Sequence, residues 1–379
     1  MQSSVNVIHV LGSLNVGGAE SRIMDIYEKI DSNKIKFEFV SMDMSHNQFF
    51  EDNILLKGGK VHKIDSPRKV GLFYHFKQLV EIFNKKNKDG NLIVHAHTLH
   101  HCGIVMLAAK ISNVKIRITQ SRNTKSQHNN LKNKILIILG KFLIYFFATY
   151  KLAITEASAK FLYYNTDIKN KKVKIVPNAI NLDKYKNISV ENIIKLKKEY
   201  NINSNQKVIG HVGRFEQMKN HKFLIKLFFE YRSQNPNSIL ILIGDGSLKK
   251  ETKDLVDDLK LTDNVLFLGI RNDVHFWMNI FDVVLLPSLF EGLPGVVSEA
   301  QAAGTPCILS NNITRKSDLN LGLLTYVKLN DTKQAWINAI KDKMNFKTLS
   351  FNLIEEKFDK NNLSLNKGIE ALNKIYNIS

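Results

Sequence analysis

The stretch FDVVLLPSLFEGLPGVVSEAQAAGTPCILS, residues 281–310, has the pattern of a strand, a loop, a helix and a second strand. Its first seven residues form an apolar run that ends at a proline, which is typical of a buried strand leading into a loop. Pro294 suits the first position of a helix, where its missing N–H is not needed. Gly304 can take the left-handed conformation that ends a helix, and the apolar run 307–309 follows it. The stretch therefore predicts one strand–helix–strand unit of an α/β fold.

The predicted helix begins just beyond the carboxyl end of a strand, so its free N–H groups at about residues 295–297 suit a phosphate. Glu291 precedes the helix, and Glu299 lies about one turn below Gly295 on the same face. Because carboxylates repel phosphates, we expect their partners to be sugar or ribose hydroxyls. A ligand with both phosphates and vicinal diols is predicted, and a nucleotide-sugar is such a ligand.

The sequence EGLPGVVSE followed by AQAAGTPC resembles the Glu-x7-Glu signature of retaining glycosyltransferases of family 4, also called glycosyl transferases group 1. A bare Glu-x7-Glu is a weak signal, but the flanking residues LPSLFEGLP and EAQAAGTPC make it specific. The resemblance implies the two-domain GT-B fold, with Glu291 near the donor sugar and diphosphate and Glu299 on the nucleotide ribose. Two solvated acids at a helix end are the alternative. The neighbouring donor-binding candidates are Gly292, Leu293, Pro294, Gly295 and Val296.

The length of 379 residues exceeds the usual limit for a single core, so we expect two domains of about 180 residues each. Both halves alternate strands and helices, which favours two doubly wound, Rossmann-like α/β domains facing across a cleft. An acceptor-side domain is expected over residues 1–180 and a nucleotide-sugar-binding domain over residues 181–360. By resemblance, a C-terminal helix within residues 361–379 is expected to cross back onto the first domain.

The chain carries 54 Lys and Arg residues against 35 Asp and Glu residues, and this net charge of +19 favours an acidic partner. It contains no recognisable zinc finger or aromatic RNA-binding motif, so an anionic membrane surface is expected rather than nucleic acid. Cys102 and Cys307 lie far apart in apolar segments, which indicates free thiols in a reducing compartment. The first residues do not resemble a signal peptide, so a cytoplasmic protein is expected.

The longest apolar-rich run is ILIILGKFLIYFFATYKLAI over residues 135–154. It is interrupted first by Gly140 and Lys141 and then by Thr149, Tyr150 and Lys151. Neither uninterrupted block approaches the ~20 residues that span a bilayer, so a buried helix followed by a strand is expected. A membrane-contacting helix is the alternative, because Lys132, Lys134 and Lys141 suit an anionic lipid surface. Peripheral association with the inner face of the plasma membrane is the corresponding expectation.

The first half opens with an apolar strand over residues 5–11, a loop and a helix from Ala19. Its glycines do not follow the Gly-x-Gly-x-x-Gly spacing, so a dinucleotide site is poorly supported. LGSLNVGGAE instead resembles the first loop of the same glycosyltransferase family, whose Gly-Gly pair lies near the donor phosphates and the acceptor. Gly17 and Gly18 would allow that close approach, and a tight turn without a ligand is the alternative.

Four histidines, His95, His97, His100 and His101, occur in HAHTLHH at the end of the strand predicted over residues 92–96. His95 and His97 alternate along the chain and could share a metal, but neither has Asp, Glu or Cys as an immediate neighbour, and no metal is expected. His97 is expected to line the cleft, because catalytic groups gather at the carboxyl ends of strands in such sheets.

The strand predicted over residues 115–119 leads into RITQSRNTK, residues 117–125, which departs from the family. Many relatives carry a His-Ser-His-Asn-like stretch here, with a His beside the reacting sugar, whereas this chain has Gln120 and Arg122. Arg122 is expected to position a charged acceptor or to stabilise developing negative charge. It cannot act as a general base at neutral pH.

In the second half, GRFEQMKNH follows a strand predicted over residues 207–212. By resemblance, Arg214 and Lys219, beside Gly213, should contact the donor phosphates and neutralise the departing nucleotide, so no metal cofactor is expected. Ordinary surface cations are the alternative. GIRNDV resembles the family loop beside the nucleotide base, which makes Arg271 a further donor-binding candidate.

These features predict a retaining hexosyltransferase that moves a sugar from a nucleotide-sugar, expected to be UDP-linked, to a lipid-linked or growing glycan. The product would be a surface polysaccharide such as a capsule, exopolysaccharide or lipopolysaccharide. A sugar-nucleotide epimerase of the same fold and a non-catalytic donor-binding partner of another transferase are the alternatives. The catalytic candidates are Arg214, Lys219, Glu291, Arg122 and His97.

Overall fold

The computed structural model describes residues 4–124, 131–346 and 348–376, and the chain divides into two compact units. Unit 1 comprises Met1–Ala179 and Leu365–Ser379, and unit 2 comprises Ile180–Ser364. The sequence analysis predicted that the C-terminal segment belonging to the first domain begins at residue 361. In the structure this segment begins at Leu365. The segment before Leu365 stays with unit 2 because the Ile180 N–H donates to the Leu363 carbonyl at 2.7 Å.

Unit 1 is built on a seven-stranded sheet with the order β3-β2-β1-β4-β5-β6-β7, in which all paired strands are parallel. The chain starts at the centre of the sheet, builds one side, then crosses to the other, so the order reverses between β1 and β4. This is the doubly wound arrangement predicted from the sequence. The strands are β1 (Val5–Leu11), β2 (Ile35–Ser41), β3 (Lys60–Lys63), β4 (Leu92–Ala96), β5 (Ile116–Ser121), β6 (Tyr150–Ala153) and β7 (Val173–Ile175).

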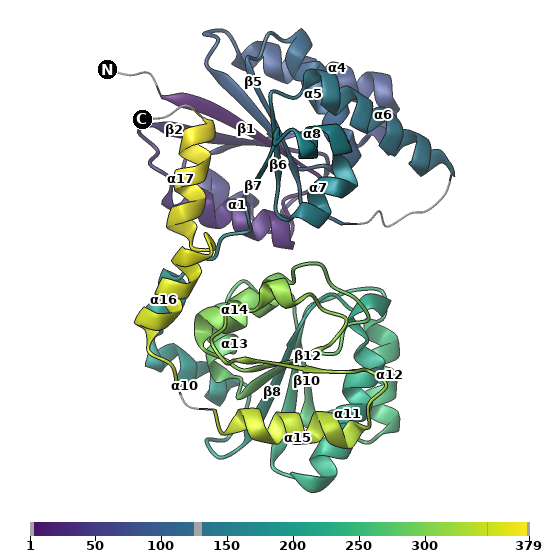
Figure 1. Cartoon of the computed structure of the whole chain (residues 1–379), viewed down its shortest axis with the longest axis vertical. Helices are drawn as coiled ribbons and strands as arrows, with labels where there is room; N and C mark the ends of the chain where they lie inside the picture. The colour runs from purple at the N-terminus through teal and green to yellow at the C-terminus, as the bar shows by residue number, and fades with distance from the viewer. Residues whose placement is uncertain (1–3, 125–130, 347, 377–379) are drawn as a thin grey trace. The chain divides into compact units, whose positions relative to one another are not determined.

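Helices cover both faces of the unit 1 sheet (Figure 1). One core contains Val94, Val105 and Ile144 and lies under the helices that follow β3, β4 and β5, while the other contains Val7, Phe37 and Tyr376. Two buried cores, one on each face, explain why the central strands are almost continuously apolar. The helices are α1 (Gly18–Lys29), α2 (Glu51–Leu56), α3 (Pro67–Val70), α4 (Leu72–Lys86), η1 (Leu99–His101), α5 (Cys102–Ile111), α6 (Leu131–Phe147), α7 (Glu156–Leu162), α8 (Asn165–Lys169) and α17 (Leu365–Ile375).

Unit 2 repeats this plan with a six-stranded parallel sheet of order β10-β9-β8-β11-β12-β13. Here the order reverses between β8 and β11. All six residues of β9 are buried, as a strand covered on both faces requires. The strands are β8 (Lys207–Val212), β9 (Ser238–Ile243), β10 (Val265–Gly269), β11 (Val283–Leu286), β12 (Cys307–Ser310) and β13 (Leu324–Val327).

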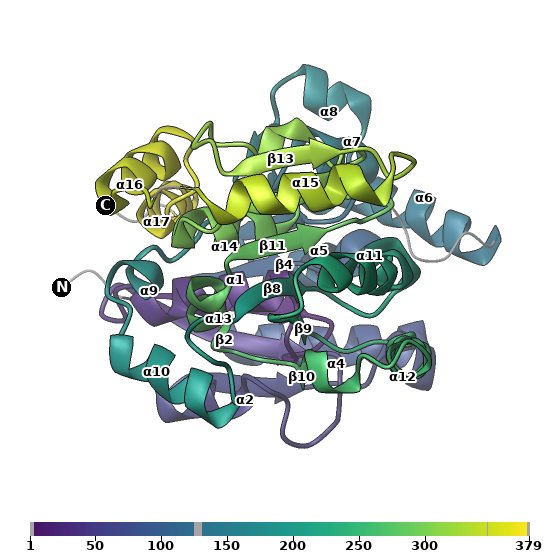
Figure 2. The same cartoon turned by 90° about the horizontal axis from the view of Figure 1, so that it is seen from below.

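The helices of unit 2 lie on both faces of its sheet, with α11, α12 and α15 on one side and α10, α13, α14 and α16 on the other (Figure 2). Trp336 is fully buried in the first core and Trp277 in the second. The helices are α9 (Asp183–Lys186), α10 (Val190–Glu199), η2 (Gln217–Lys219), α11 (His221–Gln234), α12 (Lys249–Asp258), η3 (Thr262–Asn264), α13 (Val274–Ile280), α14 (Gly295–Ala303), η4 (Arg315–Ser317), α15 (Lys333–Met344) and α16 (Phe351–Lys360).

The last helix of the chain, α17, belongs to unit 1 and packs against α1. Leu372 and Ile375 on this helix, with Tyr376 just after it, are buried against strands β1 and β2. The Tyr376 hydroxyl also forms a hydrogen bond of 3.0 Å with His95 Nδ1 on β4. The C-terminal segment therefore completes the second core of unit 1.

Helix α6 and strand β6 account for the apolar run 135–154, but the expectation of a buried helix was wrong. Seven large apolar side chains of α6 on one stripe are 41–75 % exposed. Gly140 and Gly103 bring the opposite face of α6 close to η1 and α5, because a Cβ on Gly140 would lie 2.2 Å from the His100 carbonyl oxygen. None of the helices within the described residues is both long and apolar enough to cross a membrane.

Candidate functional site

The carboxyl ends of β8 and β11 meet where the strand order of unit 2 reverses, which is where open α/β sheets bind ligands. The loop after β8 is tied directly to the loop after β11. Asn220, in a left-handed conformation with φ of 58°, donates from Nδ2 to the Pro287 carbonyl at 3.1 Å. The Leu289 N–H donates to the Met218 carbonyl at 2.8 Å. These two contacts hold the predicted phosphate-binding loop beside the predicted Glu-x7-Glu loop.

Lys219 and Glu291 form an ion pair between these loops, with 2.5 Å between Nζ and Oε1. Their side chains are only 13 % and 10 % exposed, and the Ser288 hydroxyl donates to the same carboxylate oxygen at 3.2 Å. Gly213 leaves room for this lysine, because a Cβ there would lie 3.0 Å from Lys219 Cε. Arg214 follows Gly213 and is exposed. The structure thus brings two predicted residues into contact and leaves the Arg214 guanidinium at the surface.

Helix α14 begins at Gly295, so Pro294 is its N-cap residue, whereas the sequence analysis predicted it as the first helical residue. Pro294 has φ of −70° and ψ of 119°, and extended backbone at this point brings the chain in from Glu291. Gly295 is exposed while Val296 is buried, so the first turn presents backbone rather than side chains. Gly304 ends the helix with φ of 72°, in the left-handed conformation predicted from the sequence.

The other predicted residues of this segment lie close to these groups along the chain. Gly292 and Leu293 connect Glu291 to the helix and are partly buried. Glu299 lies on α14, four residues after Gly295, and is also partly buried.

Two buried histidines lie beside Lys219 and were missed by the sequence analysis. His211 Nδ1 donates to the Leu285 carbonyl at 2.8 Å, and the His221 ring stacks on Phe215 with 4.1 Å between ring centroids. Burial, with a smaller contribution from Lys219, lowers the pKa of His221 to about 4. Burial also holds the pKa of His211 well below its ordinary value. Both rings are therefore neutral near pH 7, and positive charge here comes from Lys219 and Arg214.

Arg271 lies just after β10 and forms a two-point ion pair with Asp273. Its Nε and Nη2 donate to the two carboxylate oxygens at 2.8 and 2.5 Å, and its Nη1 donates to the Tyr200 hydroxyl at 3.2 Å. The hydrogen bonds with Asp273 raise the pKa of Arg271. In this arrangement the guanidinium holds its own loop together, a role that sequence resemblance did not indicate.

In unit 1, Gly17 and Gly18 lie where the loop after β1 enters α1. Gly17 is the N-cap residue, and a Cβ on it would lie 2.3 Å from Glu20 Oε2. The close backbone approach expected at this glycine therefore exists in the structure, but the group that uses it is the Glu20 carboxylate.

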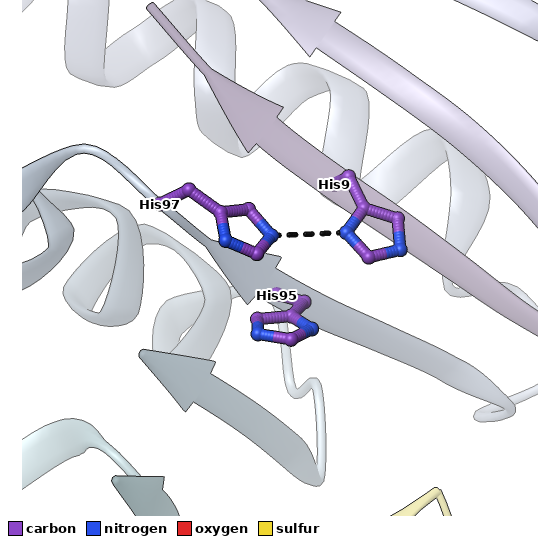
Figure 3. Close-up of side chains that lie close together, drawn as sticks. All are labelled: His9, His95 and His97. Carbon is purple, nitrogen blue, oxygen red and sulfur yellow. Dashed lines mark hydrogen bonds between the residues drawn. The ribbon is translucent and has the colours of Figure 1, made fainter. Parts of the chain in front are cut away.

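Three histidine rings converge at the carboxyl ends of β1 and β4 (Figure 3). His9 and His95 are register partners on the two strands, and His97 follows β4. His9 Nδ1 lies 3.0 Å from His97 Nε2, and one nitrogen of each ring lies within 4.8 Å of the others. The sequence analysis did not single out His9. The signal that could have found it is a histidine within the strand predicted over residues 5–11.

The predicted histidine cluster is split in the structure. His100 and His101 lie in η1, where His101 pairs with His75 at 2.9 Å between their Nε2 atoms. Burial lowers the pKa of His9 to about 3 and holds those of His95 and His97 well below their ordinary value, so all three rings are neutral. Neutral imidazoles can bind a metal, and the group of potential ligands found in the described residues consists of these three rings.

Arg122 follows β5 and is partly buried next to this cluster. Its Nε donates to His97 Nδ1 at 3.4 Å, its Nη2 to Gln120 Oε1 at 2.9 Å and its Nη1 to Asn178 Oδ1 at 2.5 Å. The two predicted residues His97 and Arg122 are therefore in direct contact. Asn178, which the sequence analysis did not single out, is a third member.

The arrangement in unit 2 combines a cation, a carboxylate and a helix N-terminus at one sheet edge. Such a set can bind a diphosphate and a hydroxyl-bearing group together, and it can stabilise negative charge that develops on a leaving phosphate. The arrangement in unit 1 offers a guanidinium held by neutral groups.

Comparison with known proteins agrees with this chemistry. The model of glycosyl transferases group 1 matches residues 192–342, and the model of glycosyltransferase family 4 matches residues 16–184. EpsF of Bacillus subtilis, named as a glycosyltransferase, is 32 % identical over 379 residues, covering 100 % of this chain and 97 % of EpsF. The chain belongs to glycosyltransferase family 4, and the predicted family and enzyme class are confirmed.

Two further comparisons concern the fold and the kind of reaction. HepE from Anabaena, solved in complex with UDP and glucose, has a TM-score of 0.76 at 18 % identity, with 98 % of each chain covered. This likeness confirms two Rossmann-like units of the GT-B class. An Escherichia coli relative, named UDP-Gal:alpha-D-GlcNAc-diphosphoundecaprenol alpha-1,3-galactosyltransferase, is 28 % identical and covers 72 % of this chain and 71 % of that protein.

Proposed function

We propose that this glycosyltransferase moves a sugar from a UDP-sugar to a lipid-linked saccharide during surface polysaccharide synthesis, with retention of anomeric configuration. The observation that carries the proposal is the Lys219–Glu291 pair, held between the β8 and β11 loops close to the start of α14 along the chain. HepE, which shares the fold, was solved with UDP and glucose. The Escherichia coli relative is named for a UDP-sugar donor and a diphosphoundecaprenol acceptor.

In this proposal the basic residues act on the donor diphosphate. Lys219 and Arg214 contact its phosphate oxygens and stabilise the charge that develops as the glycosidic bond breaks. The free N–H groups at Gly295 and Val296 bind phosphate as a helix N-terminus does. These groups supply the positive charge that a metal ion supplies elsewhere, so the proposed reaction needs no resident metal.

The two glutamates act on hydroxyls in this proposal. Glu291 accepts from the donor sugar, with Lys219 and Ser288 fixing the carboxylate, and Glu299 accepts from the ribose.

Calorimetric titration with UDP, GDP and ADP in the presence of a chelator tests the proposal. We expect binding that prefers UDP, survives the chelator and weakens by about tenfold or more in Glu299→Ala, because a charge-assisted hydrogen bond contributes about 1.5–3 kcal/mol. Glu356→Ala, which removes an exposed carboxylate from α16 in the same unit, is the matched control.

Each outcome of this titration has a clear meaning. No binding of any nucleotide would overturn the donor site and the transferase mechanism built on it. Binding that disappears with the chelator would overturn the metal-free part alone, and loss of UDP preference would overturn the choice of donor nucleotide.

We also propose that the enzyme works at an anionic membrane surface, through the exposed face of α6. Seven side chains on this face follow the i, i+4, i+7, i+8, i+11, i+14, i+15 spacing of one helical stripe, about 22 Å long. We call this set the α6 apolar stripe. Its members are Leu131, Ile135, Ile138, Leu139, Phe142, Tyr145 and Phe146.

Charge supports a lipid surface as the partner of the α6 apolar stripe. Helix α6 contains no acidic residue, and the exposed Lys134 and the partly buried Lys141 flank the stripe. An apolar face beside lysines is the composition of helices that lie in the interface of anionic bilayers. The net charge of +19 adds attraction over a longer range.

Flotation with vesicles of phosphatidylcholine and phosphatidylglycerol is expected to recover the wild-type protein. The variant Ile135→Glu/Ile138→Glu is expected to lower the bound fraction by about tenfold or more, since two apolar side chains leave the interface and two negative charges meet it. The measurement is the protein recovered with vesicles at moderate salt.

A matched control places the same change elsewhere. Val190 and Ile194 on α10 of unit 2 are 69 % and 61 % exposed, and Val190→Glu/Ile194→Glu makes the same charge change. We expect this variant to bind like the wild type. Equal binding by all three proteins would remove α6 as the docking element, and no binding by the wild type would remove the membrane surface.

A further inference from the structure

Among the described residues, the side chains that accept hydrogen bonds from Arg122 are all neutral. The imidazole of His97 and the side-chain oxygens of Gln120 and Asn178 each accept one hydrogen bond from it. Within the described parts of the chain, no carboxylate forms an ion pair with Arg122, although the negative charge of Glu20 raises its pKa. A guanidinium has five N–H groups, so two of them, on Nη1 and Nη2, have no acceptor within these residues.

The charge on Arg122 persists at neutral pH. Burial lowers its pKa to about 10, which still leaves the guanidinium protonated at pH 7. A cation removed from water is unfavourable unless an opposite charge compensates it. Glu20 supplies part of this compensation, and the two available N–H groups of Arg122 can bind a further anion.

Two of the three histidines, His97 and His9, hold Arg122 in one orientation. Because Arg122 Nε–H must donate, His97 Nδ1 is an acceptor and His97 Nε2 carries the ring proton, which is donated to His9 Nδ1 (Figure 3). His9 Nε2 then carries a proton as well, and it is buried without a partner. This chain of hydrogen bonds uses one lone pair on His97 and one on His9, and it places a guanidinium beside them. The cluster therefore suits an anion better than a cation.

We propose that Arg122 binds an oxyanion of the sugar acceptor, and that His97 and His9 are positioning residues for it. The inference rests on the proposed function, because it assigns the acceptor of the same transfer reaction a negative charge. Arg122 lies at the carboxyl end of β5, next to β4, at the sheet edge where α/β domains bind ligands. A planar guanidinium with two N–H groups available matches the two oxygens of a phosphate or carboxylate.

The oxyanion has two possible sources with the same chemistry. It is either a phosphate of the diphosphate that links a saccharide to its lipid, or the carboxylate of an acidic sugar in the acceptor. Both present paired oxygens to Arg122.

Calorimetry on the full chain saturated with UDP tests the inference, with inorganic pyrophosphate, glucuronate and glucose as probes. UDP fills the donor site first, so a further binding event reports a second site. We expect pyrophosphate or glucuronate to bind, and glucose not to bind. Arg122→Gln is expected to weaken that binding about tenfold or more, because a charge-assisted contact is lost.

Two other variants make the result specific. Arg122→Lys keeps the positive charge but loses the planar guanidinium with its paired N–H donors, so its affinity should fall between those of the wild type and Arg122→Gln. This variant remains informative if Arg122→Gln does not fold. Arg68→Gln removes an exposed arginine of the same unit and should bind each probe like the wild type. Thermal unfolding of each variant checks its folding.

The probes separate the two sources and the two proposals. Pyrophosphate binding alone assigns the diphosphate, and glucuronate binding alone assigns an acidic sugar. If UDP binds but neither anion does, or if anion binding is unchanged in Arg122→Gln, the inference is overturned while the donor site stands. Failure of UDP itself to bind would count against the proposed function.

Discussion

Replacing Lys219 by methionine is expected to weaken UDP binding by about ten- to a hundredfold while leaving the affinity for uridine unchanged, because one charge-assisted contact to the diphosphate is lost. Turnover should fall further, by about a hundred- to a thousandfold, since the lysine also stabilises charge on the leaving nucleotide. Calorimetry with UDP and with uridine measures the first effect without any knowledge of the acceptor.

The control for this variant lies three residues away. Lys222, at the start of α11, is exposed, and Lys222→Met makes the same chemical change outside the ion pair. It should bind UDP within about twofold of the wild type. Wild-type affinity for UDP in Lys219→Met would contradict the diphosphate role, and an equal loss for uridine would indicate a distorted fold instead.

Replacing Lys151 by methionine is expected to destabilise unit 1 by about 3–5 kcal/mol. Lys151 on β6 pairs with Asp167 on α8 at 2.5 Å, and their side chains are 8 % and 3 % exposed. Methionine fills a similar volume but leaves a buried carboxylate without its partner. Urea unfolding followed by hydrogen exchange of unit 1 amides measures the change.

The partner variant distinguishes a lost charge pair from lost packing. Lys151→Met/Asp167→Leu removes both charges and should recover most of the stability, because apolar residues often replace a buried ion pair without loss. Lys77→Met breaks an exposed pair with Glu81 in the same unit and should change stability by at most about 1 kcal/mol. If the double variant is no more stable than Lys151→Met, the charge argument is wrong.

Much of the fold could be predicted because its signals are local. Apolar runs ending at turn residues located the central strands of both sheets, and Gly304 ended α14 as expected. The Glu-x7-Glu segment gave the family, which the comparisons confirm. In each case the residues that carry the signal lie within a few positions of one another.

The features that escaped prediction depend on contacts between distant residues. His9 and His97 are in hydrogen-bond contact although 88 positions separate them in the sequence, and 56 positions separate Arg122 from its partner Asn178. The ion pair of Arg271 with Asp273 is local, but the resemblance to a base-binding loop predicted a ligand contact for Arg271 instead. The exposed stripe of α6 could not be separated from a core helix by composition, because both faces of this helix are apolar.

The placement of α17 in unit 1 affects the order in which the protein can fold during synthesis. Unit 2 is continuous in sequence, whereas the core of unit 1 that holds Val7 and Phe37 also needs Leu372 and Tyr376. At about 5–20 residues per second, a ribosome needs roughly ten to forty seconds to make the intervening segment 180–364. Throughout that time the nascent amino-terminal part carries an open apolar surface, so the half made first is the last to be completed.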